Sequence, residues 1–517
     1  MTEEEEAKCK KTSHSTLRQI AIAAIIAAAR INNGLVIGWP SKLPKIQSEE
    51  DGLPISEEDI AWLASMMGLV YIVACFITGP LDELLGPKRL LNLVLIPLPA
   101  CWLLQAFTPN VSFLYVGRGL SALCGAMIAT LVSPLLAELC DTKHRGMVST
   151  LAEIMLDIGL LTSYSLAKSL PWRLATALCA VPFVILILLT PFVPESPYWL
   201  VEKNKVKEAE RALLRLRGAK ASVSEELNAI TSTMVQRNPS LYEQISKLKR
   251  ARYAQPVILV TVIFMLREIG GPNVIFLYSV YMFTRTGVKL DAFTCSILIG
   301  IVRFTFTIIA AIVLDRVGRR PILQYSSLAC AGAATIAGAV LIGDLEGSSW
   351  IPLAAVLLFV AAYGLGLGPV PWVLIGELLP TPVRALGASL VTSFGYLMLF
   401  IMNFVFPLVI KRIGLGWTLI FFALANLVLT MVVWAHLPET NNKTLQELET
   451  IFCKEHMEAS CKQCTDDSTT PSQSNFSIPA IRIQESDDDW ASVQIKNGQV
   501  IAFYSNNAYE KSEEEKV

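Results

Sequence analysis

Six charged side chains lie inside stretches of the sequence that are otherwise apolar enough to cross a membrane. They are three acids and three arginines: Glu153, Asp157, Glu268, Arg30, Arg267 and Arg303. Glu153 and Asp157 are four residues apart and therefore share one face of a helix. An unpaired charge at the centre of a bilayer costs at least about 2.5 kcal/mol, so we expect the acids to neutralise the arginines. The sequence thus predicts a buried charge network in a hydrated cleft.

A second pattern of charges occurs twice in the chain. Glu138 and Arg145 in AELCDTKHRG are repeated as Glu377 and Arg384 in GELLPTPVRALG, each pair closing a long apolar stretch. The flanking segments are repeated too, because GPLDELLGPKR and LDRVGRRP precede the two copies, and PESPYWL and PETNNKTL follow them. A repeat of this size, made of spans and charged joints, indicates two helical bundles around a central path.

The repeated charges could tie the ends of spans together on the inner face. Charge-assisted hydrogen bonds there would stabilise the state closed toward the cytoplasm and would break when it opens. Charged residues at span ends also occur through ordinary snorkelling. The candidate gating residues are Glu83, Arg118, Glu138, Arg145, Asp315, Arg316, Arg319, Arg320, Glu377 and Arg384.

The elements that position these charges follow from composition. The chain has 517 residues, of which 53% are hydrophobic and 17% charged, and a mean hydropathy of +0.50. These values exclude a soluble globule with a polar surface and indicate a polytopic membrane protein. Twelve apolar windows can cross a hydrocarbon core of about 30 Å. We therefore expect an all-α fold of twelve transmembrane helices in two six-helix bundles.

The sequence divides into five parts. They are a cytoplasmic N-terminal tail (1–16), a first bundle (17–193), a cytoplasmic linker with short helices (194–254), a second bundle (255–437) and a cytoplasmic C-terminal tail (438–517). Lys and Arg concentrate in the linker, so the positive-inside rule predicts that both termini are cytoplasmic. The last tail is rich in Ser, Asp, Glu and Asn, which predicts a largely disordered segment.

Several motifs resemble those of the sugar porter family of the major facilitator superfamily. The resemblance covers roughly residues 17 to 450. Within the family, the sequence is most similar to the branch of insect facilitated trehalose transporters. The matching motifs are D-R-x-G-R-R (Asp315, Arg316, Gly318, Arg319, Arg320), P-E-S-P (Pro194 to Pro197) and Gly117-Arg118 in the fourth span. The loop of the first half departs from the pattern, because Leu84, Pro87 and Lys88 stand where arginines are usual. Because these arginines are missing, we expect the inner gate to be held less tightly.

The resemblance also implies which residues face the path. Asn273 and Trp372 keep the family's amide in span seven and aromatic residue in span ten, whereas charges replace amides in spans five, seven and eight. Gly395-Tyr396 replaces an Asn-Trp pair. The candidate substrate-binding residues are Glu153, Asp157, Arg267, Glu268, Asn273, Arg303, Trp372 and Tyr396. Asn32 and Asn33 either face the path or satisfy neighbouring helices.

The charge network has three possible roles. It could bind a polar substrate, it could lock the structure with little transport, or it could couple protons. Proton-coupled relatives carry an Asp in span one after G-Y, but here Gly38-Trp39 is followed by Pro40. Glu153 or Glu268 would have to serve instead. The Gly and Pro cluster of GLGLGPVP in span ten predicts a hinge.

We therefore expect a facilitator that moves a sugar, trehalose or a hexose-like polyol, by alternating access. The alternatives are a proton-coupled sugar symporter and a non-transporting sensor whose C-terminal tail recruits cytosolic partners. We expect no enzyme activity and no cofactor, and the absence of a Walker-type loop argues against an ATP-driven pump. The spacing of Cys453, His456, Cys461 and Cys464 could suit zinc, but free or palmitoylated thiols are favoured, so no metal is expected. The expected partners are a small sugar and the lipid bilayer of the plasma membrane, without nucleic acid.

Overall fold

The structure is a computed structural model. It describes residues 18–48, 53–139, 145–217, 223–224, 227–228, 230–231, 241–284, 288–343, 350–380, 383–440, 481–486, 489–496 and 499–505. The chain divides into two units, Met1–Lys454 and Glu455–Val517. The two units are described separately.

The described residues contain eleven stretches that are long and apolar enough to cross a membrane. They are Arg18–Ser48, Glu57–Leu85, Pro87–Ala106, Val111–Leu136, Thr150–Ser169, Trp172–Phe192, Tyr253–Leu277, Ala292–Leu314, Arg319–Gly343, Ile351–Leu378 and Leu386–His436. The last has 51 residues, about 75 Å of helix, which is more than two crossings of a core of about 30 Å. Gly414 interrupts it with φ 83°. The described chain therefore makes the twelve crossings that the sequence predicts.

The first six crossings form one half of the larger unit. After the first helical turns from Arg18, its elements are α2 (Ile31–Gly38), η1 (Trp39–Lys42), α3 (Leu43–Ser48), α4 (Glu57–Leu85), α5 (Pro87–Leu95), α6 (Leu98–Ala106), α7 (Val111–Leu139), α8 (Arg145–Ser169), α9 (Trp172–Ala177), η3 (Leu178–Ala180), α10 (Val181–Leu189) and η4 (Thr190–Phe192). Helix α4 begins with a capping box in which Ser56 and Asp59 satisfy each other's backbone N–H groups.

The second half and the linker follow. The linker helices are α11 (Pro197–Glu202), α12 (Val206–Arg217) and α14 (Leu241–Leu248). The second half contains α15 (Ala251–Ile269), α16 (Pro272–Leu277), α17 (Ser279–Phe283), α18 (Ala292–Val317), α19 (Arg319–Gly343), α20 (Ile351–Ala362), the π-helical turn η5 (Tyr363–Leu367), α21 (Val370–Leu378) and α22 (Arg384–His436).

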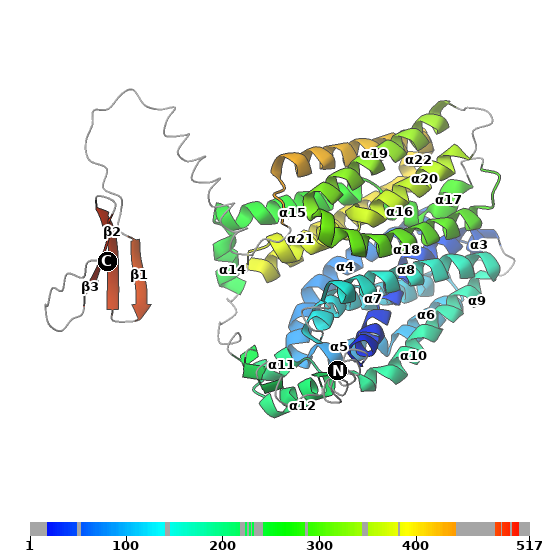
Figure 1. Ribbon diagram of the computed structural model, residues 1–517. Coiled ribbons are helices and arrows are strands. Elements are labelled where there is room, and N and C mark those ends of the chain that lie inside the picture. The colour runs from blue at the N-terminus through cyan, green and yellow to red at the C-terminus, as the bar shows by residue number, and fades with distance from the viewer. Residues whose placement is uncertain are drawn as a thin grey trace, which may run out of the picture. The chain divides into compact units, whose positions relative to one another are not determined.

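The two halves meet along two pairs of helices (Figure 1). Helix α4 packs against α22, and α8 packs against α18. Within the first half, α2 packs on α8 backbone to backbone: a Cβ on Gly34 would lie 1.9 Å from the Leu156 carbonyl oxygen, and one on Gly159 would lie 2.2 Å from that of Ile31. Glycine at both positions therefore fixes the spacing of these two helices.

The linker covers one end of this bundle. Trp199 Nε1 donates to the Glu83 carbonyl oxygen (3.0 Å), and Arg18 donates to that of Arg215 (3.1 Å). We call this end, which carries α11 and α12, the linker end, and the opposite one the far end. Twelve crossings are an even number, so the described chain from Arg18 to Leu437 begins and ends at the linker end.

The smaller unit contains an antiparallel sheet of three strands, β1 (Ile481–Ser486), β2 (Asp489–Lys496) and β3 (Gln499–Ser505), in the order β1-β2-β3. The expectation of a largely disordered tail did not anticipate this sheet. The sequence does carry a signal for it, because apolar and polar residues alternate in IRIQ and SVQIK, and Asn-Gly separates β2 from β3. Residues 441–480 lie outside the described part of the tail.

Candidate functional site

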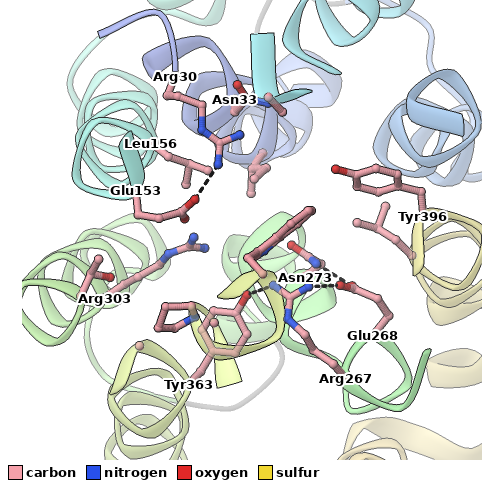
Figure 2. Close-up of a pocket in the computed structure, with 18 of the residues that line it drawn as sticks. Arg30, Asn33, Glu153, Leu156, Arg267, Glu268, Asn273, Arg303, Tyr363 and Tyr396 are labelled. Atoms are coloured by element: carbon pink, nitrogen blue, oxygen red, sulfur yellow. Dashed lines mark hydrogen bonds and ion pairs between the residues drawn. The ribbon is translucent and has the colours of Figure 1, made fainter. Parts of the chain in front are cut away.

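A polar cavity with a volume of about 80 Å³ lies between the two halves (Figure 2). The hollow that continues from it toward the linker end has a volume of about 330 Å³, which is within the range of about 300–1,000 Å³ that small-molecule sites occupy. Seven of the eight predicted substrate-binding residues line it: Glu153, Arg267, Glu268, Asn273, Arg303, Trp372 and Tyr396. The eighth, Asp157, is not part of the lining and is only 1% exposed.

On the first half, the cavity wall carries an ion pair between Arg30 and Glu153, whose nearest N and O atoms are 2.6 Å apart. The close packing of α2 on α8 sets this distance, because Arg30 directly precedes α2 and Glu153 lies on α8. The Glu153 side chain is 30% exposed, against 4% for Glu268 and 1% for Asp157. Glu153 is thus the most accessible carboxylate of the three.

On the second half, a broken helix presents polar groups to the cavity. Helix α15 ends at Ile269, Gly271 adopts φ 83°, and α16 begins at Pro272. A Cβ on Gly271 would lie 2.4 Å from the Phe422 ring, so glycine is required here for space as well as for backbone conformation. The break brings Asn273 back beside Glu268, and Asn273 Nδ2 donates to Glu268 Oε2 (2.6 Å).

Arg267 joins this broken helix to span ten. Its guanidinium donates to Glu268 (2.6 Å), to the Tyr363 hydroxyl (2.5 Å) and to the Leu367 carbonyl oxygen (3.0 Å). Tyr363 and Leu367 delimit η5, where span ten widens into a π-helical turn. The predicted interruption of span ten is therefore present, and part of its irregular backbone is satisfied by an arginine from span seven.

A third ion pair connects the halves. Arg303 Nε on α18 lies 2.6 Å from Asp157 Oδ1 on α8, and the guanidinium carbon lies 4.4 Å from the Phe276 ring centre. Both side chains are buried. Among the described ion pairs around the cavity, this one crosses between halves, whereas the pairs of Arg30 and Arg267 stay within one half.

The electrostatic result is a charged but balanced wall. Three guanidinium groups and three carboxylates pair one to one, and Glu153 also attracts Arg267 and Arg303. Figure 2 shows Glu153 and Arg30 facing Arg267 and Glu268 across the cavity. Removing one partner of a buried pair leaves an uncompensated charge and costs about 3–5 kcal/mol. The pairs therefore fix the shape of the cavity while leaving hydrogen-bonding groups along its wall.

Aromatic rings complete the cavity. Trp372 is 37% exposed and packs edge to face on Phe264 at 5.1 Å, and Tyr396 does the same on Tyr71 at 4.9 Å. Tyr71 and Tyr363 also line the cavity, and neither is among the residues predicted to bind substrate. Tyr71 lies in the apolar middle of α4, where no neighbouring residue signals a site. Tyr363 immediately precedes the glycine cluster of span ten, which could have identified it.

The two candidate amides of span one, Asn32 and Asn33, have different surroundings. Asn33 lines the cavity and donates to the Tyr71 hydroxyl (3.0 Å) and to the Gly125 carbonyl oxygen (2.9 Å). Asn32 donates to the Ser121 carbonyl oxygen (3.0 Å) and accepts from Trp102. Asn33 therefore faces the path, and Asn32 satisfies neighbouring helices.

The far end of the cavity is closed. Trp62 on α4 packs against Phe404 (5.0 Å) and Phe400 (5.9 Å) on α22. A Cβ on Gly68 would lie 2.7 Å from the Tyr396 carbonyl oxygen. An ion pair between Glu57 and Lys411 also connects the two helices. These contacts between the halves separate the cavity from the far end.

Toward the linker end, a second hollow continues from the cavity. It shares Arg30, Ala129, Glu153, Trp372 and Tyr396 with the cavity and is also lined by Cys75, Thr130, Ser133, Ile375, Ala388, Ser389 and Thr392. These further residues lie closer to the linker end along their helices, since α4, α7 and α21 run toward it and α22 starts from it. The structure is thus open toward the linker end.

Several predicted gating charges form ties at the linker end. In the second half, Arg319 pairs with Glu377 (3.1 Å), and Glu377 also accepts from the Thr440 hydroxyl (2.5 Å). Glu439 accepts from the backbone N–H groups of Arg319 (3.0 Å) and Arg320 (3.2 Å). These contacts stay within the second half.

The first half repeats this arrangement with one difference. Ser196 donates its hydroxyl proton to Glu138, as Thr440 does to Glu377, and Glu195 accepts from Lys88 N–H (2.8 Å). Pro87 occupies the place of Arg319, so Glu138 receives no guanidinium at that position. Burial raises the pKa of Glu138; the Ser196 hydrogen bond opposes this, and nearby carboxylates add to it.

The remaining gating candidates are scattered. Glu83 and Arg316 are exposed, Arg320 donates to the Trp434 carbonyl oxygen (2.6 Å), and Arg384 donates to that of Leu379 (3.2 Å). The side chains of Arg145 and Asp315 lie outside the described residues. Arg118 does not belong with the linker-end charges, because it contacts Trp39 and Leu63 near the far end.

The described residues contain no group of three or more His, Cys, Asp and Glu side chains that could hold a metal. Cys453, His456, Cys461 and Cys464 lie outside them.

Comparison with known proteins adds independent information. The family model described as "Sugar (and other) transporter" matches residues 19–452. The facilitated trehalose transporter Tret1 of Bombyx mori is 30% identical over 439 residues, which cover 83% of this chain and 86% of that protein. Tret1 of Polypedilum vanderplanki is 28% identical over 466 residues, covering 87% and 92%.

Solved structures show the same fold. The proton:xylose symporter XylE bound to 6-bromo-6-deoxy-D-glucose superposes with a TM-score of 0.70 at 19% identity, covering 85% of this chain and 100% of that one. The inward-open conformation of XylE from E. coli gives 0.69 at 19% identity, covering 84% and 99%. The fold is therefore that of the major facilitator superfamily. Together with the match over residues 19–452, this shows that the chain belongs to the family of sugar (and other) transporters.

Proposed function

We propose that this protein is a facilitative transporter of a sugar, trehalose or a hexose-like polyol, that works by alternating access. The observation that carries the proposal is a polar cavity between two repeated halves that is closed at the far end and continues toward the linker end. Family membership and relatives named as facilitated trehalose transporters support the same substrate class. Transport makes and breaks no covalent bond.

The wall of the cavity suits a ligand rich in hydroxyl groups. Glu153 offers a partly exposed acceptor, Asn33 and Asn273 offer amides, and Trp372 offers an exposed aromatic surface. Hydroxyl groups both donate and accept, so a sugar can pair with carboxylates and amides on different sides of one cavity. The paired charges need no counterion from the substrate, which is compatible with a neutral sugar.

Alternating access follows from the distribution of contacts. In the present state, sugar leaves through the linker-end hollow, because the Trp62 aromatic cluster and the Glu57–Lys411 pair close the far end. Rocking of the halves would break these contacts and close the linker end. We place the protein in the plasma membrane with the linker end and both termini in the cytoplasm, supported by the basic linker.

The test is uptake of labelled trehalose and glucose by purified protein in liposomes, with and without an inward proton gradient. A facilitator fills the liposomes to the external concentration and no further, and the gradient leaves this end point unchanged. Accumulation above the external concentration would replace the proposal by symport. Absence of both uptake and exchange for every sugar and polyol tried would contradict transport. The variant Tyr325→Phe, altered at an exposed position on α19, serves as a control for the effect of an unrelated substitution on uptake.

A further inference from the structure

Two cations of the first half are buried away from the central cavity. Lys42, the last residue of η1, and Arg118, in α7, are both 0% exposed, and neither lines the cavity. Burial of a cation costs several kcal/mol unless an opposite charge or hydrogen bonds compensate it. Among the described residues, no ion pair includes either side chain. Lys42 and Arg118 thus differ from the three arginines of the cavity, each of which is paired with a carboxylate.

The contacts of Arg118 leave part of its guanidinium unsatisfied. Its Nε donates to the Leu63 carbonyl oxygen (3.1 Å), and its Cζ lies 4.8 Å from the Trp39 ring centre. The two terminal nitrogens, which carry four N–H groups, are buried and have no hydrogen-bond partner among the described residues. A guanidinium cannot lose its proton in a protein, so Arg118 remains charged.

Lys42 lies on the same turn as Trp39, the residue whose ring Arg118 contacts. Trp39 and Lys42 are three residues apart in a 3₁₀ turn and therefore project to the same side. The charge of Arg118 acts on the ammonium group. In the described structure the hydrogen-bond contacts of the ammonium group are a long one to Ser163 Oγ, at 3.4 Å, and one to a weak acceptor, Cys179 Sγ, at 3.8 Å. Its donors, like those of Arg118, need a better acceptor than their surroundings supply.

We propose that Arg118 and Lys42 hold a small monovalent inorganic anion of the chloride class. Such an ion accepts several hydrogen bonds from different directions and compensates the guanidinium charge. Both side chains are fully enclosed, so a multivalent or organic anion would be excluded by its size and its hydration. The contacting residues come from η1, α4, α7, α8 and η3, so the ion connects five of the first six spans and stabilises their arrangement near the far end.

The first experiment uses the unaltered full-length protein in detergent. Thermal unfolding is measured in chloride, bromide, gluconate and sulfate at equal ionic strength. Chloride and bromide are expected to raise the melting temperature by several degrees with saturation, as specific binding to the folded state requires. In crystals grown in bromide, an anomalous peak is expected between the Arg118 terminal nitrogens and Lys42 Nζ. Equal melting temperatures in all four salts, or no bromide at this position, would overturn the proposal.

The second experiment assigns the effect to Lys42. Lys42→Met is compared with Lys45→Met, a matched control whose lysine donates to the backbone carbonyl oxygens of Lys168 and Leu170. Chloride dependence is compared rather than stability itself, because losing a buried cation can change stability in either direction. Lys42→Met should raise the half-saturating chloride concentration roughly tenfold or more, the loss expected for one charged hydrogen bond, and Lys45→Met should not change it. An unchanged chloride response in Lys42→Met refutes the site, and if that variant does not fold, the bromide position decides.

Discussion

At the scale of single residues, the cavity owes its polarity to charges that compensate one another. Arg30 with Glu153, Arg267 with Glu268 and Arg303 with Asp157 each approach to 2.6 Å. The sequence predicted that these six would pair, because the membrane does not tolerate them alone. It could not predict the partners. Arg267 and Glu268 are neighbours in sequence and meet because α15 ends directly after them.

The cross-half pair gives the first prediction. Asp157→Asn leaves the Arg303 charge uncompensated, and we expect it to lower stability by about 3–5 kcal/mol. The double variant Asp157→Asn, Arg303→Gln removes both charges and should recover most of the loss. Chemical denaturation in detergent measures both, with Glu58→Gln at an exposed site as the control. Additive losses in the double variant would show that the two side chains do not interact.

Glu153 gives the second prediction. In Glu153→Gln the amide can still accept a hydrogen bond from Arg30, so sugar exchange should persist, with a weaker apparent affinity because a charged acceptor is lost. The measure is equilibrium exchange of labelled sugar in liposomes, carried out between about pH 6 and about pH 8. A variant that exchanges normally but no longer accumulates sugar under a proton gradient would assign Glu153 to proton coupling instead.

At the scale of elements, breaks in helices and close helix contacts position the site. Gly271 breaks span seven, η5 widens span ten, and Gly34 with Gly159 brings α2 onto α8. The glycine and proline cluster of span ten was readable in the sequence. The contact between Gly34 and Gly159 was not, because isolated glycines in apolar helices carry no information about which helix they approach.

The close contact of α2 and α8 gives the third prediction. Gly159→Val places side-chain atoms against the Ile31 backbone, which cannot move aside as a side chain can, and should lower stability by about 1–3 kcal/mol or prevent folding. Gly332→Val is the control, because its Cβ would meet nothing within 4 Å. The measurements are folded yield by size-exclusion chromatography and thermal unfolding. Equal yields for both variants would contradict the close approach.

The asymmetry of the linker-end ties gives the fourth prediction. The pKa of Glu138 is raised by burial, so the folded state holds its proton more tightly than the unfolded state does. The contribution of Glu138 to stability should therefore be largest below the ordinary glutamate pKa of about 4.3 and should be lost as pH rises through the raised value. Pro87→Arg supplies the guanidinium that Arg319 gives Glu377 and should weaken this dependence. The measure is thermal unfolding against pH for both proteins; identical profiles would contradict the explanation.

At the scale of the whole molecule, the twelve crossings and the two halves were predictable, because lipid requires long apolar helices and the charged joints occur twice. The conformation was not predictable. Closure at the far end depends on Trp62, Phe400 and Phe404, which read as ordinary lipid-facing residues in the sequence. The place of Arg118 near the far end and the three strands of the tail were also missed, because neither follows from the repeat.

The open linker end gives the fifth prediction. Cys75 lines the hollow there and is partly exposed, whereas Cys179 and Cys330 are buried. In a variant without the other accessible cysteines, a membrane-impermeant thiol reagent should label Cys75 from the linker side and not from the far side. Labelling of Cys179 or Cys330 at the same rate would mean that the reagent reports unfolding, and labelling of Cys75 from the far side would contradict the closed far end.

The turn at Gly414 has a mechanical consequence. Because this one residue interrupts α22, the last two crossings are joined without a flexible connection and should tilt as one lever. Tyr396 lies on the first arm, in the wall of the cavity, and Leu437 follows the end of the second arm. We therefore expect sugar binding in the cavity to shift Leu437, and a fluorophore attached there would report this shift from outside the membrane.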